Sequence, residues 1–214
     1  IVLAGKTVSM DGVQNLLARI QQQRFHEGKG AIRQHDIFPD YLETITSQIQ
    51  LARPMKIVID CGNGIAGVIA PQLYRALGCD VVELFCEVDG HFPNHHPDPT
   101  IPDNLKTLID TVKREKADIG IGFDGDADRI GVVTDRGDII WPDRQMMLFS
   151  KDVLSRQKGA KIVFDVKCTS HLPRIIEENG GQPIMYRTGH SLLKNKMFEA
   201  KAPLAGEMSG HVFF

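Results

Sequence analysis

Three carboxylates stand at alternate positions of one short run in this sequence, in the order Asp124, Asp126 and Asp128. The run ends at Arg129 and lies between two apolar segments, residues 117–122 and 130–133. Carboxylates this close repel one another by roughly 1 to 4 kcal/mol per pair, and one arginine neutralises only one of the three. A bound cation would relieve the remaining repulsion. The pattern therefore predicts a strand-loop-strand site for a divalent cation.

The ligand types narrow the choice of metal. The run offers only oxygen ligands, without a cysteine or a histidine, which favours Mg²⁺, Mn²⁺ or Ca²⁺ over Zn²⁺. Mg²⁺ commonly binds a few carboxylates and completes its octahedron with water or with a substrate phosphate. We therefore expect Mg²⁺ and a phosphorylated ligand.

Three other interpretations of the acidic run stay open. An EF-hand also begins D-x-D-x-D, and Asp135 falls at its twelfth position, but Arg129 stands where that loop needs glycine. A haloacid-dehalogenase-type aspartyl nucleophile also follows an apolar strand, yet that pattern has Thr or Val where this chain has Asp128. The third is a solvated acidic turn, and such turns seldom place three acids directly after a continuous apolar strand.

Length and composition favour a globular protein of two domains. The chain has 214 residues, of which 42% are hydrophobic and 24% charged, and its formal net charge is -2. That charge argues against nucleic acid or an anionic membrane as the main partner. The four cysteines form no C-x-x-C pair, which suits reduced thiols in a cytoplasmic enzyme. The sequence starts without a methionine or a signal peptide and stops within an apolar segment, so we expect a fragment.

The hydrophobic periodicity predicts an α/β fold of repeated sandwich domains, with mixed sheets flanked by helices. We expect a remnant of a preceding domain and a linker over residues 1–36, a metal-binding domain over 37–138 and a second domain over 139–214. Strands are expected at 1–5, 56–60, 80–85, 118–123, 130–134, 161–165, 182–186 and 203–205, and helices at 10–23, 36–51, 65–77, 103–115, 143–156, 170–179 and 191–199. The two α/β rounds are similar in layout, which hints at an internal repeat.

Several loops that follow predicted strands carry polar residues, where ligands of α/β sheets collect. Lys167 could bind a phosphate or hydroxyl as a point charge, and His190 lies at the start of a helix. The run from Glu207 to His211 offers a carboxylate, a hydroxyl and an imidazole between glycines, which suits a polyhydroxylated ring such as a sugar. The histidines of the proline-rich loop at 90–99 match no standard zinc signature, so we interpret that loop as a rigid connection.

Four motifs in order resemble those of one known family. D-G-D-A-D-R at 124–129, D-V-K-C-T at 165–169, R-T-G-H-S at 187–191 and G-E-M-S-G-H-V-F-F at 206–214 look like the bacterial phosphomannomutase/phosphoglucomutase branch of the α-D-phosphohexomutases. The resemblance runs through essentially the whole chain. It implies that the chain holds the end of the first of four domains, the whole second and most of the third. The rest of the first domain and the fourth domain would be missing.

The resemblance also implies roles for residues. Asp124, Asp126 and Asp128 would hold Mg²⁺ with Arg129 beside them, facing a phosphoserine from the first domain. The substrate would meet a set of residues from the later motifs: Lys167, His190, Glu207, Met208, Ser209, Gly210 and His211. Arg129, His190 and His211 would be catalytic, with His211 a candidate for proton transfer. Met208 favours a hexose over a hexosamine, because the phosphoglucosamine branch typically has glutamine there.

The implied reaction interconverts the 1- and 6-phosphates of mannose or glucose through a phosphoserine enzyme and a 1,6-bisphosphate. The serine loop of that family, T-x-S-H-N-P, is not found in this sequence, so we expect the 214 residues alone to be inactive. Two other functions stay open at this point. One is an aspartyl-phosphate phosphotransferase, and the other is a non-catalytic module that binds sugar phosphates.

Overall fold

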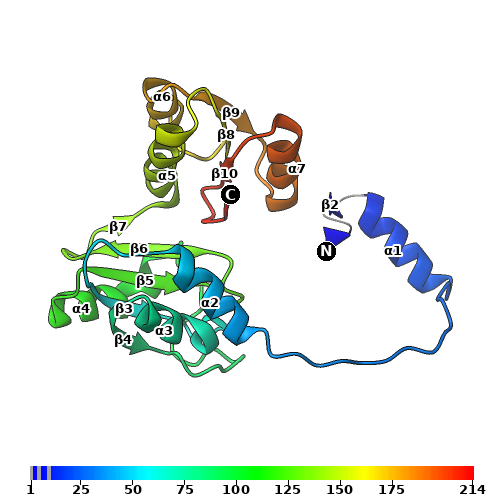
Figure 1. Ribbon diagram of the computed structural model, residues 1–214, viewed down its shortest axis with the longest axis horizontal. Helices are drawn as coiled ribbons and strands as arrows, with labels where there is room; N and C mark the ends of the chain where they lie inside the picture. Colours follow the sequence, from blue (N-terminus) through cyan, green and yellow to red (C-terminus); the bar gives the residue numbers. More distant parts are fainter. Residues whose placement is uncertain (1, 4–5, 9–10) are drawn as a thin grey trace. The chain divides into compact units, whose positions relative to one another are not determined.

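The protein is described from a computed structural model, which covers residues 2–3, 6–8 and 11–214 (Figure 1). The chain forms two compact units. We call residues 37–148 with 208–212 the five-stranded unit, and residues 1–36 with 149–207 and 213–214 the four-stranded unit.

The five-stranded unit has a mixed sheet in the order β4-β3-β5-β6-β7. Its strands are β3 (Lys56–Asp60), β4 (Asp80–Leu84), β5 (Ile119–Phe123), β6 (Ile130–Thr134) and β7 (Ile139–Ile140). β4, β3 and β5 run parallel, whereas β6 and β7 are antiparallel to their neighbours. The helices are α2 (Phe38–Gln48), α3 (Ala66–Ala76) and α4 (Lys106–Glu115), the last preceded by a 3₁₀ turn, η1 (Pro102–Leu105). The acidic run is therefore the loop between β5 and β6.

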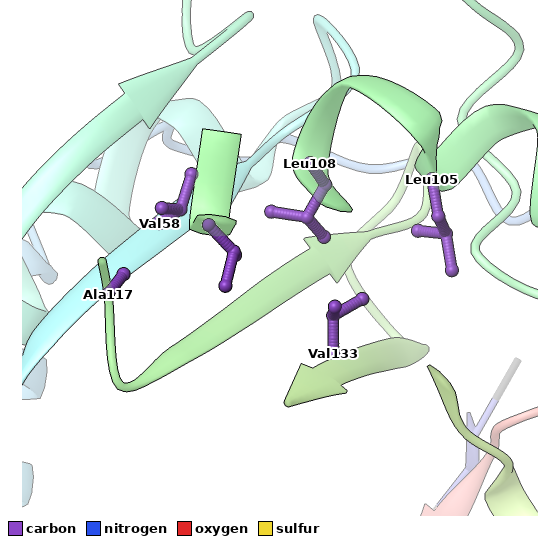
Figure 2. Packing of buried hydrophobic residues seen from close by; sticks show 6 residues of the cluster. Val58, Leu105, Leu108, Ala117 and Val133 are labelled. Carbon is purple, nitrogen blue, oxygen red and sulfur yellow. The ribbon is translucent and has the colours of Figure 1, made fainter. Parts of the chain in front are cut away.

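Helices cover both faces of this sheet because its central strand is apolar on both sides. Ile57 and Ile59 pack with α3 residues, whereas Val58 packs with Leu108 of α4 on the other face. Figure 2 shows the second cluster, whose members are Val58, Leu105, Leu108, Val112, Ala117 and Val133. This core anchors the strands whose ends carry the acidic run.

The four-stranded unit has the sheet order β11-β10-β8-β9. Its strands are β8 (Lys161–Asp165), β9 (Gln182–Tyr186), β10 (Leu204–Gly206) and β11 (Val212–Phe213), and β8 runs parallel to both β9 and β10. Its helices are α1 (Asp11–Gln21), α6 (His171–Glu178) and α7 (His190–Ala200), while α5 (Pro142–Arg156) runs from one unit into the other. In both sheets the first strand along the chain lies between the second and the third. The predicted repeat in layout is thus present in the strand order.

The predicted fold class, α/β with mixed sheets flanked by helices, is confirmed. Four predicted strands have the predicted bounds, and most other elements shift by one to three residues. The strand expected at 1–5 is seen only at β1 (Val2–Leu3), beside β2 (Lys6–Thr7), and residues 1, 4, 5, 9 and 10 lie outside the described residues. The two-residue strand β7 was not predicted, because it is too short to show alternation. The predicted domain bounds stay predictions.

Leu108 is fully buried between α4 and the sheet. We expect Leu108→Ala to lower the free energy of unfolding by about 2 to 5 kcal/mol, because the truncation removes buried apolar surface and leaves a cavity. Leu148→Ala is the matched control, since this leucine is 66% exposed. Urea unfolding followed by circular dichroism measures both, and an equal loss in the two variants would contradict this account of the core.

Candidate functional site

The acidic loop is folded around its first carboxylate. β5 and β6 pair up to Phe123 and Ile130, so residues 124–129 form the whole connection. Asp124 is 1% exposed, and its Oδ1 accepts the backbone N–H groups of Asp128 and Arg129, each at 3.0 Å. Ala127 takes the left-handed conformation (φ +62°) that lets the loop return to the sheet. Asp124 thus fixes the backbone that carries the other two acids.

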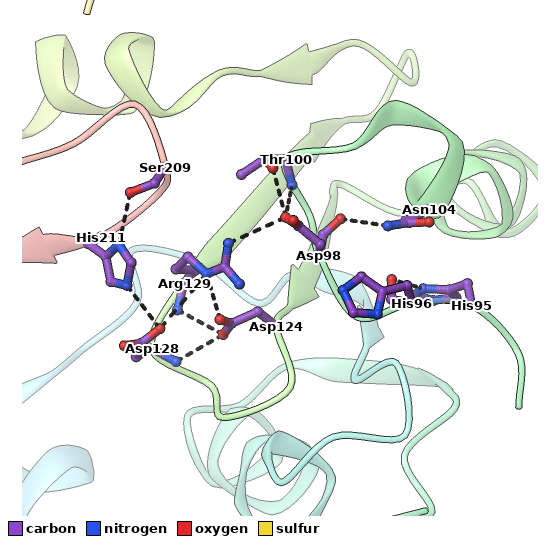
Figure 3. A network of polar contacts seen from close by, with 10 residues as sticks. All are labelled: His95, His96, Asp98, Thr100, Asn104, Asp124, Asp128, Arg129, Ser209 and His211. Carbon is purple, nitrogen blue, oxygen red and sulfur yellow. Dashed lines mark hydrogen bonds and ion pairs between the residues drawn. The ribbon is translucent and has the colours of Figure 1, made fainter. Parts of the chain in front are cut away.

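Arg129 pairs with this buried carboxylate from the other side. Its Nε donates to Asp124 Oδ2 at 2.6 Å, and its Nη1 lies 3.4 Å from Asp98 Oδ1 (Figure 3). Burial disfavours the charged form of Asp124, but the hydrogen bonds and charge of Arg129 outweigh it and hold the pKa of Asp124 below its ordinary value. The arginine thus pairs most closely with Asp124, while Asp128 Oδ1 lies 3.9 Å from its Nε, and one guanidinium cannot neutralise all three acids.

Asp126 and Asp128 are left at the surface of the loop. One oxygen from each of the three aspartates lies within 4.8 Å of the others. Repulsion from Asp128, with smaller contributions from burial and Asp124, raises the pKa of Asp126. In an octahedron with Mg²⁺–O distances of about 2.1 Å, ligand oxygens lie roughly 3 to 4 Å apart, so a small contraction would satisfy that geometry. The donor set and its excess negative charge fit a hard divalent cation.

A second segment of the same unit lies against this loop. His211 Nε2 is 3.3 Å from Asp128 Oδ1, and His211 Nδ1 is 2.8 Å from Ser209 Oγ. Gly210 has φ +101°, and a Cβ placed there would lie 3.4 Å from Arg129 Cβ. The half-buried Met208 precedes this turn. The structure thus joins Ser209, Gly210 and His211 to the predicted metal site.

The remaining predicted residues lie in the four-stranded unit. The loops after its parallel strands meet one another: Glu207 Oε1 accepts the backbone N–H of Gly189 at 2.6 Å, and Thr188 donates to the buried Asp165 at 2.9 Å. Glu207 is 2% exposed, so its carboxylate is surrounded by protein and not by solvent. The expectation that polar residues collect at the carboxyl ends of strands holds in this unit.

His190 and Lys167 flank this second group. His190 is the first residue of α7, and its ring meets Phe213 edge-on with centroids 5.4 Å apart. Lys167 lies two residues beyond β8 and is exposed. The predicted site residues therefore form two groups, one in each unit: the acidic loop with 208–211, and the loop ends around Glu207.

The histidines of the proline-rich loop do not form a metal site among the described residues, whose only candidate ligand group is the aspartate trio. His95 Nε2 lies 3.1 Å from both oxygens of the buried Asp60, and His91 pairs with Asp89. Burial raises the pKa of Asp60, and the nearby His95 opposes that shift. His95 thus ties the loop to the end of β3.

Sequence reasoning missed Asp98, which belongs to the same loop. Its carboxylate contacts Arg129, although the two are 31 residues apart in the chain. The only local signal was a carboxylate between two prolines, at 97 and 99. The EF-hand interpretation of the acidic run is wrong, because its loop joins two antiparallel strands rather than two helices.

Two family models match most of the chain. The description "Phosphoglucomutase/phosphomannomutase, alpha/beta/alpha domain II" matches residues 39–137, and the corresponding description for domain III matches residues 141–214. The chain belongs to this family, the α-D-phosphohexomutases.

Relatives of this family are similar over the whole chain. The phosphomannomutase/phosphoglucomutase of Pseudomonas aeruginosa is 59% identical over 214 residues, which are 100% of this chain and 46% of that protein. A crystal structure of a phosphoglucomutase/phosphomannomutase family protein from Burkholderia thailandensis superposes with a TM-score of 0.97 at 55% identity, covering 100% of this chain and 46% of that one. The chain thus spans about half the length of these relatives.

A more distant structure shares the fold. The N-acetylphosphoglucosamine mutase of Aspergillus fumigatus, in complex with GlcNAc-6P and magnesium, has a TM-score of 0.58 at 17% identity, over 83% of this chain and 39% of that one.

Among the described residues, no helix has the length and apolar character needed to cross a bilayer.

Removing one exposed acid tests the charge balance of the loop. We expect Asp126→Asn to raise the thermal stability of the metal-free protein, because Asp126 and Asp128 repel each other. Its raised pKa means that the folded state binds this proton more tightly than the unfolded state. The stability of the metal-free wild type should therefore fall as pH rises through the window just above 3.8, the ordinary value.

Magnesium should reverse the order of the two proteins. At a concentration 100 times the Kd, Mg²⁺ would stabilise the wild type by about 2.7 kcal/mol, and the variant by less. Calorimetric melting in EDTA and in MgCl₂ measures both, with Asp110→Asn, an exposed acid on α4, as control. Equal magnesium-induced shifts in Asp126→Asn and wild type would rule out this site.

Ala127 carries a Cβ in the left-handed region of backbone conformation, with φ +62°. The left-handed conformation is unfavourable for a residue with a Cβ, whereas glycine adopts it freely. After the greater flexibility of glycine in the unfolded chain is subtracted, we expect Ala127→Gly to stabilise the protein by about 0.5 kcal/mol. Chemical denaturation measures this, and Ala76→Gly, at the exposed end of α3, should instead be destabilising.

Proposed function

We propose that this chain supplies the cation-binding and sugar-binding loops of a phosphohexomutase. The enzyme would interconvert the 1- and 6-phosphates of mannose or glucose through a phosphoserine and a 1,6-bisphosphate. One observation carries the proposal: a single arginine, hydrogen-bonded to the buried Asp124, lies among three aspartates that each place an oxygen within 4.8 Å of the others, so the cluster keeps an excess of negative charge that a cation would balance. Membership of the phosphohexomutase family supplies the reaction class.

Asp124, Asp126 and Asp128 would hold Mg²⁺, which when bound stabilises negative charge on a transferring phosphoryl group. The Aspergillus fumigatus mutase, whose structure is a complex with magnesium, supports this choice of metal. Arg129 would contribute to the same end, because its guanidinium stays charged and its Nε already has a fixed partner. Arginine donors suit phosphate oxygens, which accept two parallel hydrogen bonds.

His211 would move a proton at a sugar hydroxyl. Its Nδ1 lies 2.8 Å from Ser209 Oγ and its Nε2 lies 3.3 Å from Asp128 Oδ1, so both ring nitrogens have partners that orient the ring. A histidine whose ring is oriented in this way is suited to general acid–base catalysis. Ser209 and the backbone at Gly210 would bind the sugar beside it, with Met208 alongside.

The group around Glu207 would recognise the sugar and its phosphate. One oxygen of Glu207 accepts the backbone N–H of Gly189, which orients a carboxylate of the type that accepts hydrogen bonds from sugar hydroxyls. His190, adjacent to Gly189, and the exposed Lys167 would contact the substrate, Lys167 as a point charge for phosphate. Because a mutase binds its sugar in two orientations, groups that accept and donate suit it better than a single rigid pattern.

The domain bounds belong to the same proposal: a remnant and linker over 1–36, the metal-binding domain over 37–138 and the sugar-binding domain over 139–214. The phosphoserine and a further phosphate-binding loop would come from two other domains. The four cysteines are free thiols, which supports a cytoplasmic protein. The partner would be a hexose phosphate rather than nucleic acid or a membrane.

Two other functions are less well supported. An aspartyl-phosphate phosphotransferase would use Asp124 as its nucleophile, yet Asp124 is buried and both its oxygens accept hydrogen bonds. A non-catalytic binding module would bind the sugar phosphate without moving its phosphate group. One experiment distinguishes the mutase, the phosphotransferase and the binding module from one another.

The test uses a protein of the relatives' full length that contains this chain. Glucose 1-phosphate and mannose 1-phosphate are supplied separately, with a trace of the 1,6-bisphosphate, in MgCl₂ or in EDTA, and ³¹P NMR follows the signals. We expect the 6-phosphate to appear only with Mg²⁺ and without inorganic phosphate. The 214 residues alone should give no conversion, because none of their serines has the T-x-S-H-N-P context.

Each rival outcome has its own signature. Release of inorganic phosphate, with a beryllofluoride adduct on Asp124, would favour the aspartyl phosphotransferase. Binding of either sugar phosphate without any 6-phosphate would favour the binding module. Conversion in EDTA would contradict the role given to the three aspartates.

A further inference from the structure

We propose that Asp98 is a positioning residue that holds the guanidinium of Arg129 in place for phosphoryl transfer. The inference deepens the proposed function and rests on it for the identity of the reaction. It assigns a task to the proline-rich loop, which the sequence alone presented as a mere connection. Asp98 can take this role because its own neighbours hold it firmly.

Asp98 has a fixed carboxylate and a fixed backbone. Its Oδ1 accepts the backbone N–H of Thr100 at 3.0 Å and the hydroxyl of Thr100 at 2.7 Å, and its backbone carbonyl accepts from Asn104 at 3.0 Å (Figure 3). Its side chain is 21% exposed. The carboxylate therefore keeps one orientation without help from Arg129.

The prolines on either side seat this residue on the sheet. Pro97 and Pro99 are both buried. A Cβ on Gly62 would lie 2.9 Å from Pro97 Cβ, and a Cβ on Gly131 would lie 2.6 Å from Pro99 Cβ, so neither glycine could carry a side chain without displacing a proline. Gly131 lies on β6, directly beyond the acidic loop. The loop is thus built to bring Asp98 to this end of the sheet.

Arg129 is then hydrogen-bonded to two carboxylates, and a third, that of Asp128, lies 3.9 Å from its Nε. The Nε–H of Arg129 donates to Asp124 Oδ2 at 2.6 Å, and Nη1 of Arg129 lies 3.4 Å from Asp98 Oδ1. The two nitrogens lie on different edges of the planar guanidinium. One partner would leave the guanidinium free to swing about the first hydrogen bond, and a second partner restrains that rotation. Orientation of this kind raises the rate of a reaction without any contact between Asp98 and the substrate.

The test compares three variants in the full-length protein. Asp98→Asn keeps the shape and the acceptor oxygen for Thr100 but removes the charge that faces Arg129. Arg129→Lys removes the planar group, and Asp98→Asn with Arg129→Lys completes a double-mutant cycle. Asp103→Asn is the matched control, because this acid lies in the same segment on η1 and its ion pair with Lys106 is exposed.

We expect Asp98→Asn to lower kcat about tenfold with little change in KM, since positioning acts mainly on the transition state. In the Arg129→Lys background the same change should alter kcat by less than about twofold, because no guanidinium remains to be positioned. Asp103→Asn should leave kcat unchanged. An equal loss of kcat from Asp98→Asn in both backgrounds, or no loss in either, would overturn the proposal.

A second readout does not depend on the reaction. In protein labelled with ¹⁵N-arginine, the Nε–H signal of Arg129 is the one lost in Arg129→Lys. Asp98→Asn should speed the exchange of this proton with water by about threefold or more, as the group loses its restraint. Unchanged exchange would contradict the role of Asp98. If the wild type had no mutase activity, the proposed function would be contradicted instead. The exchange rate of the Arg129 Nε–H would then be the test of whether Asp98 restrains the guanidinium.

Discussion

The charge balance between Arg129 and three aspartates is the constraint on which this structure depends. One arginine lies among three carboxylates: its Nε donates to the buried Asp124, and Asp128 Oδ1 lies 3.9 Å away. Two exposed acids are left beside each other, and repulsion from Asp128 raises the pKa of Asp126. A bound cation would relieve this repulsion, and contacts from several segments of the unit hold the loop in place.

Several elements share that task. Backbone N–H groups of the loop itself close around Asp124. The proline-rich loop approaches from one side through Asp98, and the turn at 209–211 approaches from another through His211. The hairpin of β5 and β6 thus carries the acids, while segments distant in sequence fix the groups around them. In the four-stranded unit the loops after β8, β9 and β10 meet in a comparable way around Asp165 and Glu207.

The sequence predicted what local pattern can encode. Apolar runs and their spacing predicted most of the strands and helices, and the alternation of acids predicted a cation site, which stays a prediction. The sequence did not predict the contact of Asp98 with Arg129, because that contact depends on two neighbouring prolines that pack against glycines from other segments. The left-handed conformation of Ala127 was also invisible, since alanine carries no signal for it. Hydrophobic periodicity describes local structure, and it does not predict which small residues of distant segments pack together.

The most direct test of the central claim is to locate a cation in a crystal of the full-length protein. Crystals grown with Mn²⁺, which can stand in for Mg²⁺ and scatters anomalously, should show one strong anomalous peak within about 2.3 Å of oxygens from Asp124, Asp126 and Asp128. The Arg129–Asp124 pair should be retained in the same crystal. A loop without a peak, or a peak bound elsewhere while the three acids stay apart, would contradict the account.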